Sequence, residues 1–373
     1  MPQLLFLTLN TYSRMGGIQQ FNRAFCLGLN RLQATQGWHV KHLALADDAL
    51  AKPNEQYQPP HTYQPFGYRR WSFSLAALRH WKRCQVVVLG HANLLPLAWL
   101  GTWLSKSTQV VLITHGYEAW QPLPWSGRLG LKKLAQCWCV SQYTASQVQQ
   151  QWGLPAAKVQ LLPNCLNPFF AAVQQADVSR LHQRLRIGRQ RRYLLTLARL
   201  SSREHRKGYD AVLEILPRLK LQFPEICYVL AGKYDDKEYF RIQDRIAALG
   251  LTGSVAMPGY VPDADLPALY QMCEIFIMPS TKEGFGIVYI EAAWSGCQVI
   301  ALNAGGASEA LLQGQLGTLV PPDNSQLLLE AVQHALANPL QPQQKSAFKQ
   351  MIQQHFGFDD FCHKQQALLE KLL

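Results

Sequence analysis

The clearest candidate for chemistry is the segment 279–292, Pro-Ser-Thr-Lys-Glu-Gly-Phe-Gly-Ile-Val-Tyr-Ile-Glu-Ala. An apolar strand, Ile275–Met278, precedes it, and the pattern predicts a helix that begins near Ile287. A glycine-bearing turn between a strand and a helix directs backbone N–H groups and the positive end of the helix dipole at an anion. Glu283 and Glu291 are placed to face the same edge, where carboxylates accept hydrogen bonds from sugar hydroxyls. A glycine turn flanked by two surface glutamates is the alternative, and spacing alone leaves both open.

A second candidate is basic and follows the predicted strand Tyr193–Ala198. Arg199 comes directly after this strand, and His205-Arg206-Lys207-Gly208 follows a short distance on. Arginine and lysine stay charged near neutral pH, so they suit a diphosphate and do not abstract protons. An ordinary basic loop is the alternative interpretation.

Two weaker candidates lie in the first half of the chain. Arg14-Met15-Gly16-Gly17 follows the first predicted strand and precedes a helical pattern over Ile18–Leu32. Paired glycines at such a turn admit a phosphate, although a plain tight turn has the same sequence. Thr114-His115-Gly116 follows the predicted strand Val110–Ile113. His115 is therefore either a polar contact at a strand end or a structural histidine.

These candidates need a scaffold, and the hydrophobic pattern supplies one. The first half is predicted to hold four buried strands, Leu4–Leu9, His39–Leu45, Val86–Leu89 and Val110–Ile113. The pattern restarts in the second half with strands at Tyr193–Ala198, Tyr228–Ala231, Ile275–Met278 and Gln298–Ala301. Continuous apolar runs are typical of parallel strands covered on both faces. Two separate series of this kind, with helical patterns between the strands, predict two doubly wound α/β domains.

Polar stretches mark the boundaries of these domains. The seam is expected near residues 170–192, where 176–192 is rich in arginine. That stretch is either a solvated helix and loop or a dedicated anion site. Pro339 and Pro342 mark a second boundary, beyond which Phe358 to Leu372 has the apolar spacing of a last amphipathic helix.

Composition excludes several classes of protein. The chain has 373 residues, 48% of them apolar and 16% charged, which fits about two packed domains and excludes a disordered chain. Its nine cysteines include no CxxC pair, which disfavours structural zinc and is typical of free thiols in a reducing cytoplasm. Residues 1–10 lack the features of a signal peptide, and the apolar stretch 91–104 is too short to span a bilayer. We therefore expect a cytoplasmic protein, soluble or peripheral at the cytoplasmic face of the inner membrane.

Charge is unevenly distributed between the halves. Residues 1–176 hold 15 Lys and Arg against four Asp and Glu, a net +11, whereas residues 177–373 hold 21 against 20. A basic half favours an anionic partner such as a phosphate, a nucleic acid or an anionic lipid. Two stretches, 68–83 and 120–133, combine basic and aromatic residues. Such stretches suit the headgroup zone of an anionic membrane, unless their aromatic residues lie in the core.

Taken together, the motifs resemble those of the retaining nucleotide-sugar glycosyltransferases of family four, which have the GT-B fold. The resemblance extends in order over nearly the whole chain. The matching segments are Gly16-Gly17, His115-Gly116, Leu162–Leu166, Arg199, Lys207-Gly208, Gly259–Pro262, Leu266–Tyr270, Glu283–Glu291 and Phe358–Leu373. Glu283 to Glu291 is the most specific match, a Glu-x7-Glu motif. Within Leu162–Leu166, Cys165 stands where the family has a glycine, which puts the contact near Asn164 in doubt.

The resemblance implies a fold and a role for each domain. The fold class is α/β, with two Rossmann-like, doubly wound parallel-sheet domains that face a central cleft. Residues 1–175, joined by the C-terminal helix 357–373, would form an acceptor-binding domain. Residues 190–356 would form the domain that binds the nucleotide-sugar donor.

Residue roles also follow from the resemblance. Glu291 would hold the ribose of the donor, and Glu283 would hold hexose hydroxyls together with the backbone amides of Gly284, Phe285, Gly286 and Ile287. Arg199 and Lys207 would neutralise the leaving diphosphate, and His115 would contact the donor sugar. Tyr260 and Val261 would border the base through their backbone. Gly16 and Gly17 would approach the phosphate or the acceptor.

The implied reaction moves a hexose, with retention at the anomeric carbon, from a UDP- or GDP-linked sugar to a glycan or lipid-linked acceptor in surface polysaccharide biosynthesis. No cofactor and no metal are expected, because fixed cations and a helix N-terminus can stabilise the departing diphosphate. Asp235-Asp236, the one adjacent Asp pair in a plausible loop, is interpreted as a solvated turn. The alternatives are a nucleotide-sugar epimerase on the same fold, a non-catalytic subunit, and a non-enzymatic anion- or nucleic-acid-binding protein. No nucleic-acid motif accompanies the positive charge, so a nucleic-acid partner is not expected.

Overall fold

The computed structural model describes residues 2–14, 16–173, 175–185, 192–203 and 206–373. The chain divides into two compact units, Met1–Asn167 with His355–Leu373 (unit 1) and Pro168–Gln354 (unit 2). The expected first domain ran on to residue 175, whereas the structure groups the chain from Pro168 onward with unit 2. Phe170 explains the difference, since its ring packs edge-on against that of Tyr270 in unit 2, with centroids 5.9 Å apart.

Unit 1 is built on a seven-stranded parallel sheet with the order β3-β2-β1-β4-β5-β6-β7. Its strands are β1 (Gln3–Thr8), β2 (His39–Ala44), β3 (Tyr63–Pro65), β4 (Val86–Leu89), β5 (Gln109–Thr114), β6 (Gln136–Cys139) and β7 (Val159–Leu161). The four strands predicted for this half correspond to β1, β2, β4 and β5. The remaining three are only three or four residues long, too short to show a hydrophobic period.

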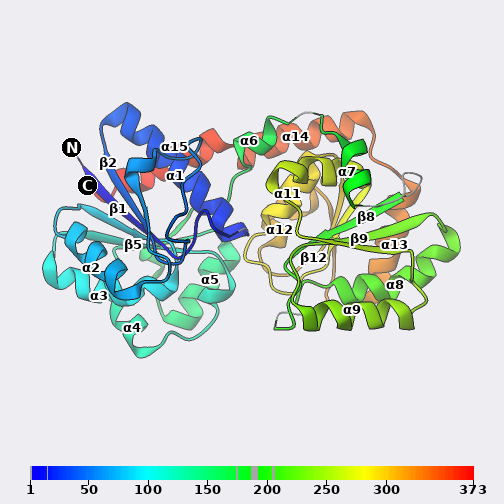
Figure 1. The fold of residues 1–373 in the computed structure, drawn as a ribbon, viewed down its shortest axis with the longest axis horizontal. Coiled ribbons are helices and arrows are strands. Elements are labelled where there is room, and N and C mark those ends of the chain that lie inside the picture. The colour runs from blue at the N-terminus through cyan, green and yellow to red at the C-terminus, as the bar shows by residue number, and fades with distance from the viewer. Residues whose placement is uncertain (1, 15, 174, 186–191, 204–205) are drawn as a thin grey trace. The chain divides into compact units, whose positions relative to one another are not determined.

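Helices cover both faces of this sheet (Figure 1). They are α1 (Gly17–Gln36), α2 (Arg70–Trp81), α3 (Leu95–Leu104), α4 (Trp125–Leu131), α5 (Gln142–Trp152) and α15 (Phe358–Glu370). Leu5 and Leu7 of β1 face a core shared with α2 to α5. Phe6 faces the opposite way and packs on Phe25 of α1, with ring centroids 4.8 Å apart. The helix α15 packs on α1, where Gln365 donates to the carbonyl of Phe25 at 3.0 Å, so the predicted last amphipathic helix completes unit 1.

Unit 2 repeats the design with a six-stranded parallel sheet of order β10-β9-β8-β11-β12-β13. Its strands are β8 (Arg192–Leu197), β9 (Ile226–Ala231), β10 (Val255–Gly259), β11 (Ile275–Met278), β12 (Gln298–Leu302) and β13 (Thr318–Val320). Its helices are α6 (Pro168–Ala171), α7 (Val178–Leu185), α8 (Tyr209–Gln222), α9 (Asp236–Ala248), α10 (Leu266–Met272), α11 (Ile287–Trp294), α12 (Ala307–Ala310), α13 (Ser325–Ala337) and α14 (Pro342–Phe356), the last of which leads back to unit 1.

The core of unit 2 also has two layers. Alternate strand residues such as Ile275 and Ile277 pack on α8, α9 and α13. Phe276 points to the other face, where its ring lies against those of Tyr270 on α10 and Tyr289 on α11. In such sheets ligands bind at the carboxyl ends of the strands, and the candidate motifs at Gly16, His115, Arg199 and Glu283 each follow a strand.

Candidate active site

The basic and acidic candidates of unit 2 meet in an ion pair. Lys207 Nζ lies 2.8 Å from Glu283 Oε2, and both side chains are largely buried, with exposed fractions of 18% and 15%. Lys207 stands just before α8, and Glu283 lies between β11 and α11. The strands β8 and β11 are neighbours in the sheet, so their carboxyl ends lie side by side. The basic candidate and the acidic candidate are thus brought together at one edge of the sheet.

Glycine at position 208 lets the two loops come this close. Gly208 has a φ of +76°, and a Cβ there would lie 2.1 Å from the carbonyl oxygen of Pro279. The two loops also share a backbone hydrogen bond, in which the N–H of Thr281 donates to the carbonyl of Arg206 at 3.0 Å. The backbone around Lys207 thus rests directly on the backbone that leads to Glu283.

A glycine pair that the sequence interpretation missed supports Glu283 from the other side. The N–H of Gly306 donates to the carbonyl of Glu283 at 2.8 Å. Gly305 has a φ of +63°, and a Cβ there would lie 2.4 Å from the same carbonyl oxygen. The signal was present in the sequence, because Gly305-Gly306 follows the predicted strand Gln298–Ala301.

Glu291 is buried inside unit 2, with an exposed fraction of 1%. The Tyr270 hydroxyl donates to its Oε2 at 3.0 Å. Burial and the neighbouring carboxylate raise the pKa of Tyr270 well above its ordinary value, so the phenol keeps its proton and remains a donor. With Glu283 also mostly buried, the alternative of two surface glutamates is wrong.

The turn between the two glutamates is buried as well. Phe285 and Ile287 have exposed fractions of 3% and 7%, and Gly284 and Gly286 are buried. Gly286 has a φ of +95° and directly precedes α11, without a side chain to cap the helix. The predicted start of this helix at Ile287 is confirmed.

The other donor-side candidates lie at the same sheet edge. Arg199 follows β8 and is exposed. Tyr260 and Val261 follow β10, and the Tyr260 side chain is half-exposed whereas Val261 is buried. His205 lies outside the described residues, as do 186–191 of the arginine-rich stretch.

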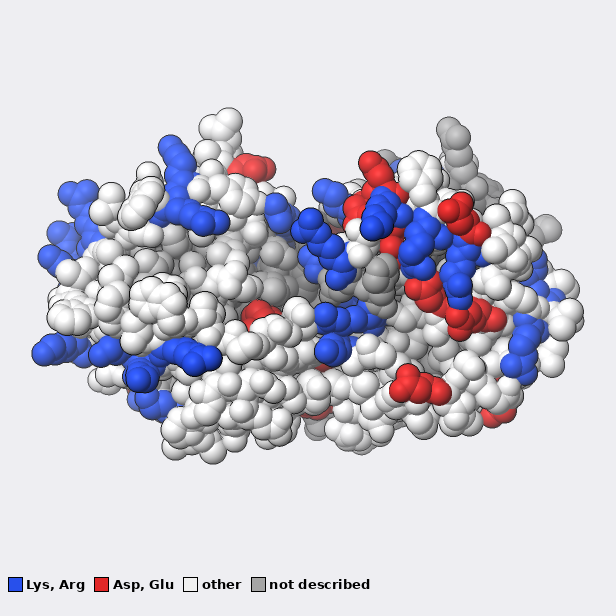
Figure 2. Space-filling model, turned by 90° about the horizontal axis from the view of Figure 1, so that it is seen from below, with Lys and Arg blue, Asp and Glu red and all other residues white. Residues whose placement is uncertain are grey.

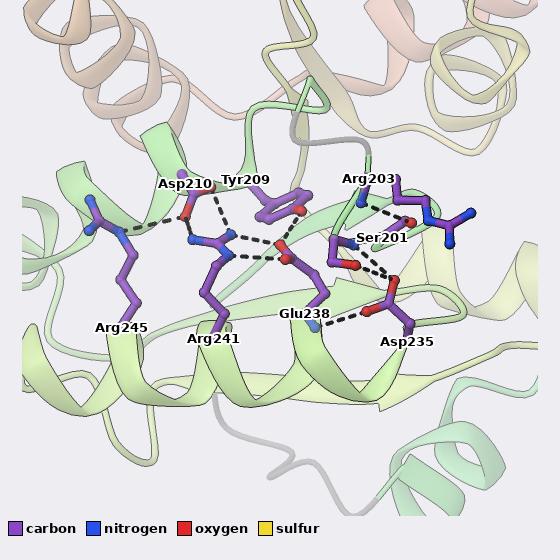
Figure 3. Close-up of polar contacts among 9 residues, drawn as sticks. Ser201, Arg203, Tyr209, Asp210, Asp235, Glu238, Arg241 and Arg245 are labelled. Carbon is purple, nitrogen blue, oxygen red and sulfur yellow. Dashed lines mark hydrogen bonds and ion pairs between the residues drawn. The ribbon is translucent and has the colours of Figure 1, made fainter.

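Asp235 is more than part of a solvated turn. Its carboxylate accepts the N–H of Glu238 at 3.0 Å, which caps α9, and the N–H of Ser202 at 2.8 Å. These backbone hydrogen bonds lower the pKa of Asp235 below its ordinary value. The expected solvated turn is therefore corrected at Asp235, which ties α9 to the segment after Arg199 (Figure 3). Asp236 opens the helix and is exposed.

A partly buried ionic network continues this connection along α9 (Figure 3). Glu238 is fully buried, accepts a hydrogen bond from the Tyr209 hydroxyl and pairs with Arg241 at 2.7 Å. Arg241 also pairs with Asp210 at 2.9 Å. Since Tyr209 and Asp210 open α8 directly after Gly208, the network fixes the helix start beside Lys207.

The unit 1 candidates occupy strand ends of their own sheet. His115 follows β5, and its ring Nε2 lies 3.0 Å from the carbonyl oxygen of Gly90. The backbone N–H of His115 donates to the Glu118 carboxylate. Burial lowers the pKa of His115 below its ordinary value, so the neutral imidazole is favoured. Gly16 and Gly17 are exposed at the start of α1. A Cβ at Gly17 would meet no atom within 4 Å.

The two basic aromatic stretches divide between core and surface. Phe73 and Trp81 of α2 are buried, as the core interpretation predicts. Trp71 is 86% exposed, however, and Trp125 of α4 is 73% exposed. Trp103 of the neighbouring α3, which neither stretch includes, is 76% exposed. Figure 2 shows Lys and Arg side chains around the rim of the visible face of unit 1. None of the helices within the described ranges is both long and apolar enough to cross a bilayer.

Comparison with known proteins agrees with this geometry. The family model for glycosyl transferases group 1 matches residues 177–354, and that for glycosyltransferase family 4 matches residues 15–168. The GDP-mannose-dependent alpha-(1-6)-phosphatidylinositol monomannoside mannosyltransferase of Mycolicibacterium smegmatis is 31% identical over 71% of this chain and 70% of its own length. The mannosylfructose-phosphate synthase of Agrobacterium fabrum is 31% identical over 46% of this chain and 38% of its own length.

Solved structures share the fold. Anabaena HepE in complex with UDP and glucose superposes with a TM-score of 0.81 at 19% identity over the whole of both chains. WaaG, a glycosyltransferase involved in lipopolysaccharide biosynthesis, gives a TM-score of 0.67 at 15% identity over 99% of each chain. The two α/β units are thus those of the GT-B fold. Together with the family models and the mannosyltransferase relative, this places the chain in the group 1, family 4 glycosyltransferases.

Proposed function

We propose that this glycosyltransferase takes a hexose from a UDP- or GDP-linked sugar and transfers it, with retention, to a glycan or lipid-linked acceptor in surface polysaccharide biosynthesis. The observation that carries the proposal is the contact between Lys207 and Glu283 at the strand ends of unit 2, in the same segment as the buried Glu291. A cation paired with one carboxylate, with a second buried carboxylate eight residues further along, suits a ligand that combines a diphosphate with sugar hydroxyls. Relatives support the donor class, because one is GDP-mannose-dependent by name and HepE was solved with UDP-glucose.

Each residue has a distinct task in this proposal. Glu291, oriented by Tyr270, accepts hydrogen bonds from the ribose, while Glu283 and the turn 284–287 hold the hexose. A bound diphosphate competes with Glu283 for the Lys207 ammonium, so donor binding exchanges one anionic partner for another. Arg199 adds a second cation at the same edge, and the backbone of Tyr260 and Val261 borders the base. In unit 1, neutral His115 contacts the donor sugar, and Gly16 and Gly17 approach the phosphate or the acceptor.

The chemical step requires stabilisation of the charge on the departing diphosphate. Lys207 and Arg199 supply fixed positive charge, and one preorganised donor in comparable oxyanion sites is worth about 3–4 kcal/mol. We therefore propose transfer without a metal. Asp235 is consistent with this, because its carboxylate already accepts two backbone N–H groups. Chelation with EDTA should leave the rate unchanged, and restoration of a lost rate by a divalent ion would contradict the proposal.

The donor is best identified by thermal shift across nucleotide sugars. A true donor at a hundred times its dissociation constant stabilises the protein by about 2.7 kcal/mol. NMR of the product then gives the anomeric configuration, which we expect to match that of the donor. Conversion of the nucleotide sugar without an acceptor would instead support the epimerase, although family membership favours group transfer.

We also propose that unit 1 associates with an anionic membrane, which would bring the enzyme to a lipid-linked acceptor. Exposed Trp71, Trp103 and Trp125 provide amphipathic contacts, and the net charge of +11 over residues 1–176 attracts anionic lipid. Co-sedimentation with phosphatidylglycerol vesicles should exceed that with phosphatidylcholine and should weaken in Trp71→Ala and Trp103→Ala. Leu221→Ala, which removes an 85% exposed side chain from unit 2, is the control. Equal binding to both vesicle types would rule out this association.

A further inference from the structure

A buried aspartate that the proposed function does not use binds the segment that precedes the glycine turn of unit 1. Asp47 comes shortly after β2 and has an exposed fraction of 0%. Its carboxylate accepts the N–H groups of Thr11, Tyr12 and Ser13 at 2.9, 3.1 and 2.9 Å. The Tyr63 hydroxyl donates to the same carboxylate at 2.7 Å. Four donors from two other segments therefore converge on one buried anion.

This arrangement is an anion-binding nest that the chain fills itself. Successive backbone N–H groups that point at one centre are the geometry with which loops bind phosphate. Here the centre is occupied by the Asp47 carboxylate, and charge-assisted hydrogen bonds of this kind are stronger than neutral ones. The N–H groups of residues 11–13 are thus bound to Asp47, whereas Arg14, Gly16 and Gly17 are exposed.

A buried cation holds the same loop from the opposite side. Arg23 of α1, with an exposed fraction of 8%, donates to the carbonyl of Thr11 at 3.0 Å and to that of Arg14 at 3.4 Å. The N–H groups of the loop are therefore bound from the β2 side and its carbonyls from the α1 side. A segment whose N–H groups and carbonyls are both hydrogen-bonded in this way has little freedom to change conformation.

The backbone of Asp47 extends the connection to a second loop. Its carbonyl accepts the N–H of Gly67 at 2.9 Å. The next residue, Tyr68, has a φ of +64°, which is uncommon for a bulky side chain, and its hydroxyl accepts a hydrogen bond from Arg14. The segment before the glycine turn and the entry to α2 are thus joined through Asp47.

We propose that Asp47 is a positioning residue that sets the conformation of residues 11–13 and thereby positions the Gly16-Gly17 turn that follows. It touches no ligand and acts through the backbone of residues 11–13. The catalytic consequence rests on the proposed function, in which this turn contacts the phosphate or the acceptor. The structural part of the proposal stands on the hydrogen bonds to Asp47 alone.

The test compares Asp47→Asn with Asp48→Asn in the full chain. Asparagine keeps the shape but has one acceptor oxygen and an NH₂ group that donates, so it cannot accept all four donors. Hydrogen exchange at the amides of residues 11–13 should accelerate at least about tenfold in Asp47→Asn. Asp48 is the exposed neighbour with the same charge, and its substitution should leave exchange unchanged.

Kinetics separate positioning from mere loss of folded protein. With rates normalised to the molecules that bind UDP or GDP in a calorimetric titration, Asp47→Asn should lower kcat at least about tenfold and leave the donor KM within about twofold. Unchanged normalised kcat together with wild-type exchange at residues 11–13 would overturn the proposal. If wild-type protein transfers no sugar from any nucleotide donor, the proposed function fails, and the exchange measurement still decides the role of Asp47.

Tyr63→Phe covers the case in which Asp47→Asn does not fold, because it removes one of the four donors and keeps the backbone hydrogen bonds. It should accelerate exchange at residues 11–13 and lower the normalised kcat with the nucleotide affinity unchanged. Wild-type values for both would overturn the proposal.

Discussion

Replacement of Gly17 by alanine separates a ligand-binding glycine from one required by the fold. Gly17 is the first residue of α1, and a Cβ there would meet no atom within 4 Å. The substitution therefore introduces no clash within the described part of the chain. If the turn binds a ligand through its backbone, the added methyl group occupies the space that the ligand needs.

The expected effects on stability and activity have opposite signs. Alanine favours a helix over glycine by about 0.5–1 kcal/mol, chiefly because the unfolded chain loses freedom. That corresponds to a rise in Tm of roughly 1–4 °C for a unit of this size. In contrast, kcat/KM should fall at least about tenfold, which is a loss of about 1.4 kcal/mol of transition-state binding.

The test measures Tm by differential scanning fluorimetry and initial transfer rates with the nucleotide sugar that the thermal-shift screen selects. Gly127→Ala is the matched control, because Gly127 lies within a helix of the same unit and a Cβ there would make only ordinary contacts of 3.4–3.5 Å. It should leave the rate unchanged. A Gly17→Ala protein with raised Tm and full activity would refute the assignment of this turn to a ligand. A lowered Tm would contradict the expectation that an added methyl group meets no other atom.

Three further predictions follow from the contacts. Lys207→Ala should lower kcat about 10²–10³-fold, as loss of one preorganised donor does, and should also lower Tm, because it leaves the largely buried Glu283 carboxylate without its cation; a near-normal rate measured at saturating donor would exclude Lys207 from the site. Tyr270→Phe removes the hydroxyl that donates to the buried Glu291, so it should lower the unfolding free energy by about 1–3 kcal/mol and weaken nucleotide binding in calorimetry. Wild-type values for both quantities would contradict the role of Tyr270. Burial lowers the pKa of His42 to about 4, below its unfolded value, so its contribution to stability is complete above about pH 6.5 and is lost as the pH falls toward 4. The free energy of unfolding, measured by denaturant titration, should fall by roughly 3 kcal/mol over this range in the wild type and by less in His42→Gln. The same dependence of unfolding free energy on pH in both proteins would contradict this.

The sequence predicted the longer strands and the strand-end motifs because both depend on local patterns. The strands β1 and β11 were visible as continuous apolar runs, and Glu283, Lys207 and Arg199 were placed correctly at strand ends. The pair Asp235 and Glu238 also carried a local signal, an acidic cap with Glu three residues later, that the solvated-turn interpretation overlooked.

Contacts between distant segments could not be predicted in the same way. The support of Glu283 by Gly305 and Gly306 depends on two loops meeting at the sheet edge, and Asp47 binds residues that are more than 30 positions away. Neither contact leaves a periodic pattern in the sequence. The exposure of Trp103 was hidden for a similar reason, because it depends on how α2 and α4 cover α3.

Calorimetric titration of UDP-glucose and GDP-mannose into the wild-type protein and into Glu291→Gln addresses the central claim, that the sheet edge of unit 2 binds a nucleotide sugar. We predict one-site binding of at least one of the two donors to the wild type and at least about tenfold weaker binding to the variant, since a neutral amide accepts hydrogen bonds less well than a carboxylate. Absence of binding by both donors, or equal affinity of the two proteins, would contradict the claim.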